Sequence, residues 1–349
     1  MRVVVVGATG NVGTSVIDAL ASDDRITEIT GIARRLPEWR PSKTRFVAAD
    51  VATDSLSHHF DGADAVVHLA WLFQPTHQPT FTWRNNVLGS IRVFDAVAAA
   101  SVPALVYASS IGAYSPGPAD DRAVNESWPT HGLPTVGYGR EKAYVERVVD
   151  TFERDQPNVR VVRLRPAFIF KRSSATSQRR LFAGPFVPNR LLRPGRVPVL
   201  PYPRGLRLQA LHSIDAADAY VRAITSDAHG AFNVAADPVL NGRDLAKILG
   251  ARPVVLPRPV VRTAVAAAWH AHLAPTDPNL LDLALGLPVM DTSRARTELG
   301  WTPRRSAHEA IGEMLEGLAD GAGGPTPPLA PDRADRRLAE IRTGVGQRP

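Results

Sequence analysis

Short apolar runs alternate with segments of helical periodicity through the first half of the chain. Runs typical of buried strands lie at residues 3–6, 28–33, 45–48, 65–70, 104–108 and 159–164. Helical patterns begin near Val12 and cover residues 83–100 and 137–154. Because short buried strands that alternate with helices form parallel sheets, the pattern predicts an α/β fold with a doubly wound parallel sheet.

The pattern changes after Pro166. Residues 171–205 are rich in proline, glycine and arginine and have weak periodicity. Residues 216–225 then have a helical pattern, and residues 231–234 are typical of a strand. We expect this last strand to return to the main sheet, so that a second lobe is built from separate segments of the chain.

The expected organisation therefore has three parts. A main domain covers residues 1–170, and residues 206–235 return to it. A smaller, discontinuous lobe that would bind the substrate covers residues 171–205 and 236–319. Residues 320–349 are expected to be a flexible tail, because glycine and proline interrupt the pattern there.

Composition excludes several classes of site. The chain has no cysteine, which rules out disulfides, thiolate metal sites and cysteine nucleophiles. The net charge of +7 comes from scattered arginines, so nucleic acid is not an expected partner. The histidine pairs lack helical metal-site spacing, and no metal is expected. Without a signal segment or an apolar helix long enough for a bilayer, we expect a cytoplasmic protein with no membrane partner.

A glycine-rich loop directly follows the first strand and leads into a helix. Glycines in this context allow a tight turn and let backbone N–H groups and the helix N-terminus approach a pyrophosphate. The sequence therefore predicts a dinucleotide site whose loop residues are Gly7, Thr9, Gly10, Asn11, Val12 and Gly13.

The end of the second strand indicates which dinucleotide binds. Folds that prefer NAD carry an acidic residue there, whereas this chain has Arg34 and Arg35 after Ala33. Two guanidiniums suit a 2′-phosphate, so NADP(H) is the expected cofactor and NAD(H) is the alternative. Asp50 and Val51, after the third strand, are expected at the adenine edge.

Tyr138 and Lys142 lie four residues apart within a predicted helix, in a chain that has only four lysines. This spacing places both side chains on one helical face. An adjacent ammonium would lower the pKa of the phenol and make Tyr138 a candidate general acid and base. The alternative is a half-buried tyrosine beside a solvated lysine.

With these features the chain resembles the extended short-chain dehydrogenases/reductases, and more narrowly the NAD-dependent epimerase/dehydratase group. The resemblance spans residues 1 to about 319 and implies a Rossmann fold. It is carried by the glycine loop, His68-Leu69-Ala70, residues 85–90, Tyr107-Ala108-Ser109-Ser110, the Tyr138/Lys142 pair, Arg165-Pro166, residues 212–215, Phe232-Asn233-Val234 and residues 298–303.

The resemblance implies roles for individual residues. Tyr138 would be the acid/base, and Lys142 would hold the ribose and lower the pKa of the phenol. Ser110, preferred to Ser109 by its spacing from a later tyrosine, would donate to the reacting oxygen, and Asn86 would organise a water near the lysine. The cofactor would also contact Leu69, Ala70 and Pro166. Family members suggest a homodimer through the helices near residues 84–100 and 137–154.

Departures from the family pattern narrow the reaction. Ile111 and Gly112 stand where family dehydratases carry acids, so dehydration is disfavoured. The resemblance then implies an NAD(P)-dependent oxidoreductase that acts on a secondary alcohol or ketone. The alternatives are a nucleotide-sugar epimerase that retains its dinucleotide and a non-catalytic NADP(H)-sensing protein.

The substrate is expected to be small and polar or anionic. Trp71 stands where the family has a small residue, and its indole would either narrow the pocket or pack in the core. Arginines after residue 170 could hold an anion, although arginines on an irregular loop are usually solvated and that interpretation is favoured. They are Arg179, Arg180, Arg190, Arg193 and Arg196.

Overall fold

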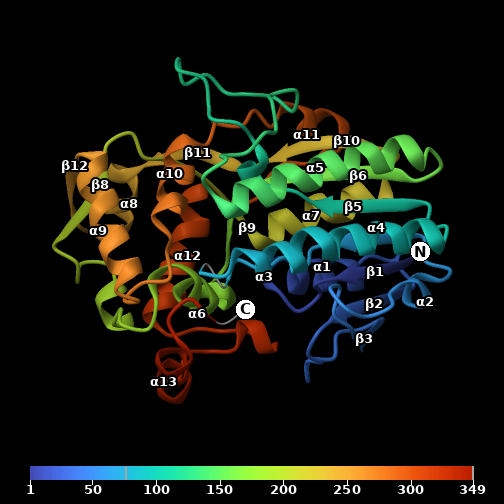
Figure 1. Cartoon of the computed structure of the whole chain (residues 1–349), viewed down its shortest axis with the longest axis horizontal. Coiled ribbons are helices and arrows are strands. Elements are labelled where there is room, and N and C mark those ends of the chain that lie inside the picture. Colours follow the sequence, from blue (N-terminus) through green and yellow to red (C-terminus); the bar gives the residue numbers. More distant parts are fainter. Residues whose placement is uncertain (75–76, 348–349) are drawn as a thin grey trace.

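The computed structural model describes residues 1–74 and 77–347 and has a seven-stranded parallel sheet at its centre (Figure 1). The strand order is β10-β6-β5-β4-β1-β2-β3, which confirms the predicted doubly wound α/β fold. The strands are β1 (Arg2–Val6), β2 (Glu28–Ala33), β3 (Thr44–Ala48), β4 (Ala65–His68), β5 (Ala104–Ala108), β6 (Arg160–Pro166) and β10 (Gly230–Val234).

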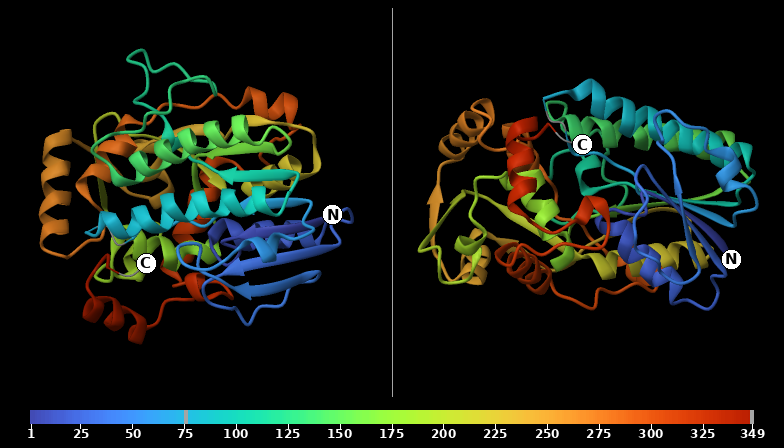
Figure 2. Two further views of the ribbon diagram at one scale, coloured as in Figure 1. Left: turned by 45° about the vertical axis from the view of Figure 1, so that its right-hand side comes forward. Right: turned by 90° about the horizontal axis from the view of Figure 1, so that it is seen from below.

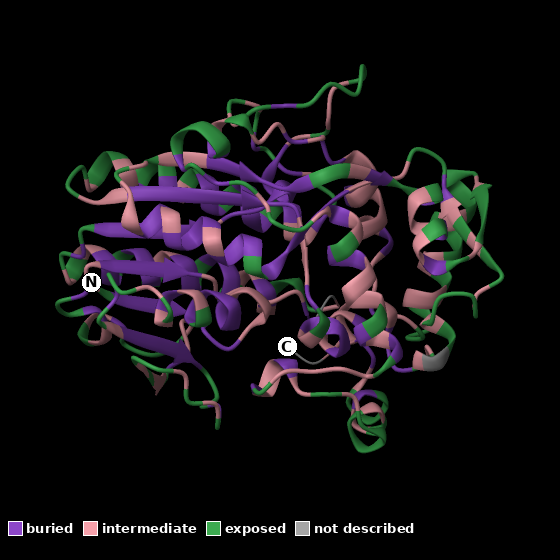
Figure 3. Cartoon of the chain, turned by 180° about the vertical axis from the view of Figure 1, so that it is seen from behind, coloured by how far each residue is buried: buried purple, intermediate pink, exposed green. Residues whose placement is uncertain are grey.

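Helices cover both faces of this sheet. Because alternate residues of a strand face opposite sides, Val3 and Val5 of β1 pack in one apolar cluster and Val4 and Val6 in another. The first cluster includes residues of α1 (Asn11–Ala21) and α7 (Ser213–Thr225), and the second includes residues of α4 (Gly89–Ala99) and α5 (Gly137–Asp155). Figure 3 shows that buried residues concentrate in these layers.

The second lobe contains two small sheets. One has the order β11-β9-β7 and the other pairs β12 with β8. Its strands are β7 (Phe168–Phe170), β8 (Val199–Pro203), β9 (Arg207–His212), β11 (Ala236–Asn241) and β12 (Arg252–Leu256). Two further short helices belong to the main domain, α2 (Ser57–Phe60) and α3 (Pro79–Trp83). The helices after residue 170 include α6 (Ala175–Gln178), α8 (Gly242–Leu249), α9 (Arg258–His270), α10 (Pro278–Gly286), α11 (Ser293–Glu298) and α12 (Ala307–Ala319).

Residues 206–235, which were expected to return to the main domain, contribute to two different sheets. Strand β10 pairs with β6, and α7 packs on the central sheet. Strand β9 instead pairs in parallel with β7 and antiparallel with β11. The reason is that β7 follows β6 almost directly and extends beyond the central sheet, where it offers β9 an edge.

The C-terminal segment differs from the flexible tail expected for residues 320–349. It contains a short 3₁₀ turn, η6 (Pro327–Leu329), and a helix, α13 (Ala334–Thr343), and Figure 2 shows it in red against the body of the protein. The Arg179 guanidinium donates to Glu340 of α13 at 2.8 Å, and both side chains are buried. Glycine and proline content did not predict this packing, because it depends on a buried arginine far away in sequence.

No helix within residues 1–74 and 77–347 is both long enough and apolar enough to span a membrane.

Candidate active site

The glycine loop joins β1 to α1 at the carboxyl edge of the central sheet. Gly7 has a φ of 90°, and a Cβ there would lie 2.7 Å from the backbone nitrogen of Ala70. A Cβ at Gly13 would lie 2.3 Å from the carbonyl oxygen of Gly7. The fold itself therefore requires these two glycines, since real Cβ atoms do not approach other atoms so closely.

Gly10 lies in a different environment. The nearest described atom to a Cβ built there is the Gly7 carbonyl oxygen, at an ordinary contact distance of 3.5 Å. Gly10 is the N-cap residue of α1, and within the described part of the chain no side chain caps this helix. The N–H groups of the first turn are thus left for another acceptor, which fits the pyrophosphate of a dinucleotide.

Alanine substitutions should separate these two roles of glycine. Gly10→Ala keeps a permitted backbone, with φ −78° and ψ −177°, so we expect an unchanged melting temperature. Its methyl group would fill the phosphate site and weaken dinucleotide binding by about tenfold or more. Gly13→Ala should instead cost about 2 kcal/mol of stability or more through overpacking. Thermal unfolding measures the stability of the two variants, and fluorescence titration measures their affinity for NADPH. Equal losses of stability in the two variants would contradict the assignment of Gly10 to the phosphate site and of Gly13 to packing.

Strands β4 and β6 bring other expected cofactor residues to this edge. The Leu69 N–H donates to the Val6 carbonyl oxygen at 2.8 Å, so Leu69 and Ala70 run beside the glycine loop. Pro166 is the buried last residue of β6. Ligands of such sheets bind at the carboxyl ends of the strands, where these residues lie.

Strands β2 and β3 end in the residues expected at the adenosine part of the cofactor. Arg34 and Arg35 are exposed in the turn after β2, whose last residue, Ala33, is buried. Asp50 and Val51 follow β3 and are both partly exposed. The structure therefore places all four residues where the chain leaves the sheet at its carboxyl edge.

The structure brings Ser110 and Tyr138 together. Both side chains lie at Gly112: a Cβ built there would lie 2.6 Å from the Tyr138 ring and 3.4 Å from the Ser110 Oγ, which accepts from Gly112 N at 2.9 Å. Gly112 therefore permits the approach of the tyrosine ring. The neighbouring Ser109 instead donates its hydroxyl to Glu146. Ser110 rather than Ser109 is thus the serine at the tyrosine.

Lys142 does not act on Tyr138 as the sequence suggested. Its buried ammonium donates to the Ala108 carbonyl oxygen at 2.7 Å and lies 3.4 Å from the ring centroid of Trp71. Burial holds the pKa of Lys142 well below its usual value. Burial also raises the pKa of Tyr138 to about 12, although Ser110 lowers it in part. The expected lowering of the phenol pKa by Lys142 is therefore wrong for this structure.

Asn86 binds the backbone of Leu72 and the side chain of Glu141, and its expected role toward a water stays a prediction. It lies in a single π-helical turn, η1 (Arg84–Leu88), a feature common at functional sites. Its Nδ2 donates to the Leu72 carbonyl oxygen at 2.8 Å and to Glu141 at 2.7 Å, and its Oδ1 accepts from Leu72 N at 2.7 Å. Both amide donors are used, so Asn86 holds the segment after β4 on the site.

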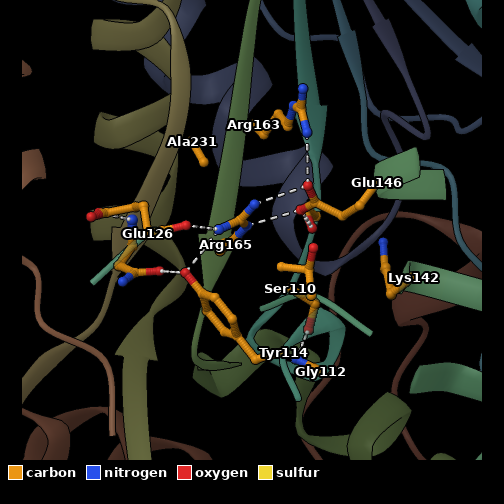
Figure 4. A network of polar contacts seen from close by, with 12 residues as sticks. Ser110, Gly112, Tyr114, Glu126, Lys142, Glu146, Arg163, Arg165 and Ala231 are labelled. Atoms are coloured by element: carbon orange, nitrogen blue, oxygen red, sulfur yellow. Dashed lines mark hydrogen bonds and ion pairs between the residues drawn. The ribbon is translucent and has the colours of Figure 1, made fainter. Parts of the chain in front are cut away.

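Glu146 is a residue of the site that the sequence analysis missed. In Figure 4 dashed lines join its carboxylate to Arg163 and to Arg165, and the Arg165 Nε donates to it at 2.9 Å. Burial opposes its ionisation, but the bond and charge of Arg165, together with Arg163, lower the pKa of Glu146 to about 2. The i+4 spacing of Tyr138 and Lys142 continues to Glu146, and this signal could have found it.

The arginines expected near an anionic substrate have different surroundings. Arg180 is partly exposed in the π-helical turn that also carries Phe182. Arg179 is buried and bound to Glu340, and Arg193 donates to Asp320 at 3.3 Å on the surface. Arg196 is exposed. The side chain of Arg190 lies outside the described residues.

Known proteins resemble this chain over different shares of its length. It is 27% identical to an uncharacterised protein of Mycobacterium tuberculosis over 355 residues, which cover 99% of this chain and 90% of the relative. It is 39% identical to the L-arabinose 1-dehydrogenase (NAD(P)(+)) of Haloferax volcanii over 110 residues, or 31% of this chain and 41% of that enzyme.

The fold is also that of solved structures. UDP-glucose 4-epimerase of Thermus thermophilus, in complex with NAD, superimposes with a TM-score of 0.66 and 21% identity, over 91% of this chain and 99% of that one. At this identity the likeness shows the fold alone. Residues 3–235 match the NAD dependent epimerase/dehydratase family, and the chain therefore belongs to that family.

Proposed function

We propose that the protein is an NAD(P)-dependent oxidoreductase of the extended short-chain type, which transfers a hydride at a secondary alcohol or ketone of a small substrate. The observation that carries this proposal is that Ser110 and Tyr138 meet at Gly112, on the sheet edge that holds the glycine loop. A protein that only senses a dinucleotide needs the loop but no paired proton donors.

The residues suit a reduction in particular. Bound NAD(P)H would supply the hydride. Ser110 and Tyr138 would donate hydrogen bonds to a carbonyl oxygen as negative charge develops on it. Because burial raises the pKa of Tyr138 to about 12, the phenol carries its proton at neutral pH and can give it to that oxygen. Lys142 and the glycine loop would hold the cofactor.

A nucleotide-sugar epimerase that retains its dinucleotide is the second candidate. The fold shared with the Thermus thermophilus UDP-glucose 4-epimerase favours it, because that enzyme was solved with NAD bound. An epimerase should purify with cofactor absorbance and need no added NAD(P)H. A reductase should consume NADPH in a 1:1 ratio with the product, and turnover of a nucleotide sugar without cofactor consumption would replace the first proposal with the second.

We further propose that NADP(H) is preferred to NAD(H), because Arg34 and Arg35 follow β2 without an acid. Replacing both arginines with alanine should raise the KM for NADPH by about tenfold, since charge-assisted bonds to a 2′-phosphate are lost, and leave that for NADH nearly unchanged. The ratio of kcat/KM for the two cofactors measures the effect. A wild-type preference for NADH would refute the proposal.

The cytoplasmic location and the homodimer through the helices near residues 84–100 and 137–154 stay predictions.

A further inference from the structure

Aromatic side chains form one wall beside Tyr138. Phe73 stacks on the phenol ring with the centroids 4.6 Å apart and the planes 14° apart. Phe182 meets Phe73 edge to face at 5.9 Å, and Trp71 meets Tyr138 in the same way at 5.9 Å. Trp71, Phe73 and Phe182 are all partly exposed, so the wall is a surface of the site and not only part of the core.

Two sets of hydrogen bonds hold this wall in place. Asn86 binds both the N–H and the carbonyl oxygen of Leu72, which lies between Trp71 and Phe73 in the segment after β4. Gln74 is buried, and its Nε2 donates to the carbonyl oxygens of Arg180 and Leu181 at 3.1 and 3.4 Å. These bonds join the segment after β4 to the turn η4 (Arg179–Ala183), which carries Phe182.

Two cations near the wall, Arg179 and Lys142, already have partners, and a third, Arg180, lies on the same turn as Phe182. Arg179, at the start of the turn that carries Phe182, is neutralised by Glu340. The Lys142 ammonium is covered by the indole of Trp71. A nucleotide sugar would have to bring two phosphate charges beside aromatic faces, where the loss of their hydration is costly.

We propose that the substrate is a flat, apolar ketone or secondary alcohol, with an aryl or fused alicyclic ring that binds against Phe73 and Phe182. Phe73 and Phe182 present aromatic rings beside Tyr138, and an offset-stacked or edge-to-face contact with such rings favours a cyclic, aromatic substrate over an open-chain one. This inference rests on the proposed function and narrows its substrate class.

The reaction balances with the residues already described. The carbonyl carbon takes the hydride from NAD(P)H, which is oxidised to NAD(P)⁺, and the C=O π bond breaks. The carbonyl oxygen takes the proton of Tyr138, which solvent then restores. The products are the secondary alcohol and the oxidised cofactor.

The test begins with the cofactor alone. Fluorescence titration with NADPH and NADH tests the proposed function, and a protein that binds neither refutes both that function and this inference. Initial rates are then measured with 2-acetylnaphthalene and 1-tetralone, with acetoin as a small polar ketone, and with UDP-glucose. We expect kcat/KM for an aryl ketone to exceed that for acetoin by about a hundredfold, as burial of a ring against an apolar wall would give.

Variants of the wall connect this preference to the structure. Phe182→Ala should raise the KM for the aryl ketone about tenfold and leave the Kd of NADPH unchanged. Phe182→Leu should have a KM for the aryl ketone between those of the wild type and of Phe182→Ala. This variant tests the wall if the alanine variant fails to fold. Phe186→Ala is the control, because Phe186 belongs to the same lobe but is 51% exposed.

Two results would overturn the inference and leave the oxidoreductase proposal standing. The first is a protein that binds NADPH and reduces acetoin, with oxidation of the cofactor, but reduces no aryl ketone. The second is a Phe182 variant whose kcat/KM falls equally for acetoin and for the aryl ketone.

Discussion

Replacing Tyr138 with phenylalanine is expected to lower kcat by about 10²- to 10⁴-fold, the range typical of a lost general acid. The phenylalanine ring keeps the stack on Phe73 and the contact at Gly112, so the fold should be unaffected. Only the phenolic hydroxyl group is lost. Steady-state kinetics on the best substrate measure the loss, and NADPH titration should give the wild-type Kd.

Tyr144→Phe provides a matched control. Tyr144 lies on the same helix as Tyr138 but is 47% exposed, and its variant should keep the wild-type kcat. If Tyr138→Phe instead retained full activity on the true substrate, the hydroxyl would not be the proton donor. The NADP(H)-sensing protein would then become the better interpretation of a fold that has kept its glycine loop.

The features that were predictable from the sequence are those encoded locally. The parallel sheet followed from alternating apolar runs, and the glycine loop from its position between β1 and α1. The choice of Ser110 over Ser109 agrees with the structure, because a tight turn at Gly112 fixes which hydroxyl faces Tyr138.

The features that were missed depend on contacts between distant segments. Lys142 has the predicted helical position, but its partner Trp71 lies in the segment after β4. Spacing along the helix cannot show whether the ammonium contacts Trp71 or Tyr138. The C-terminal segment was judged from its glycines and prolines, yet the Thr326 hydroxyl donates to the Thr9 carbonyl oxygen in the glycine loop at 2.7 Å. A composition rule carries no information about such a bond.

Replacing Glu146 with glutamine is expected to have the largest effect on stability, at about 3 to 5 kcal/mol, the cost of breaking a buried ion pair from one side. Arg165 would keep only neutral partners, the Tyr114 hydroxyl at 3.0 Å and the Glu126 carbonyl oxygen at 2.8 Å. Glu153→Gln is the control, because that carboxylate also binds Arg163 but is 32% exposed and should cost less than about 1 kcal/mol. Urea unfolding at pH 7 compares the two.

The pH dependence tests the same charge without relying on one variant. The pKa of Glu146 is lowered to about 2, so its contribution to wild-type stability is fully present above the pKa of an unfolded glutamate and is lost as the pH falls toward 2. Glu146→Gln has no such proton to gain, and the difference in unfolding free energy between the two proteins should shrink from pH 5 to pH 3. A difference that stayed constant over this range would show that packing, and not the buried carboxylate charge, accounts for the loss. The double variant in which leucine replaces both Glu146 and Arg165 separates these two explanations. If the buried charge accounts for the loss, removal of both charges should restore much of the stability that Glu146→Gln loses. If packing accounts for it, the double variant should be at least as unstable as Glu146→Gln.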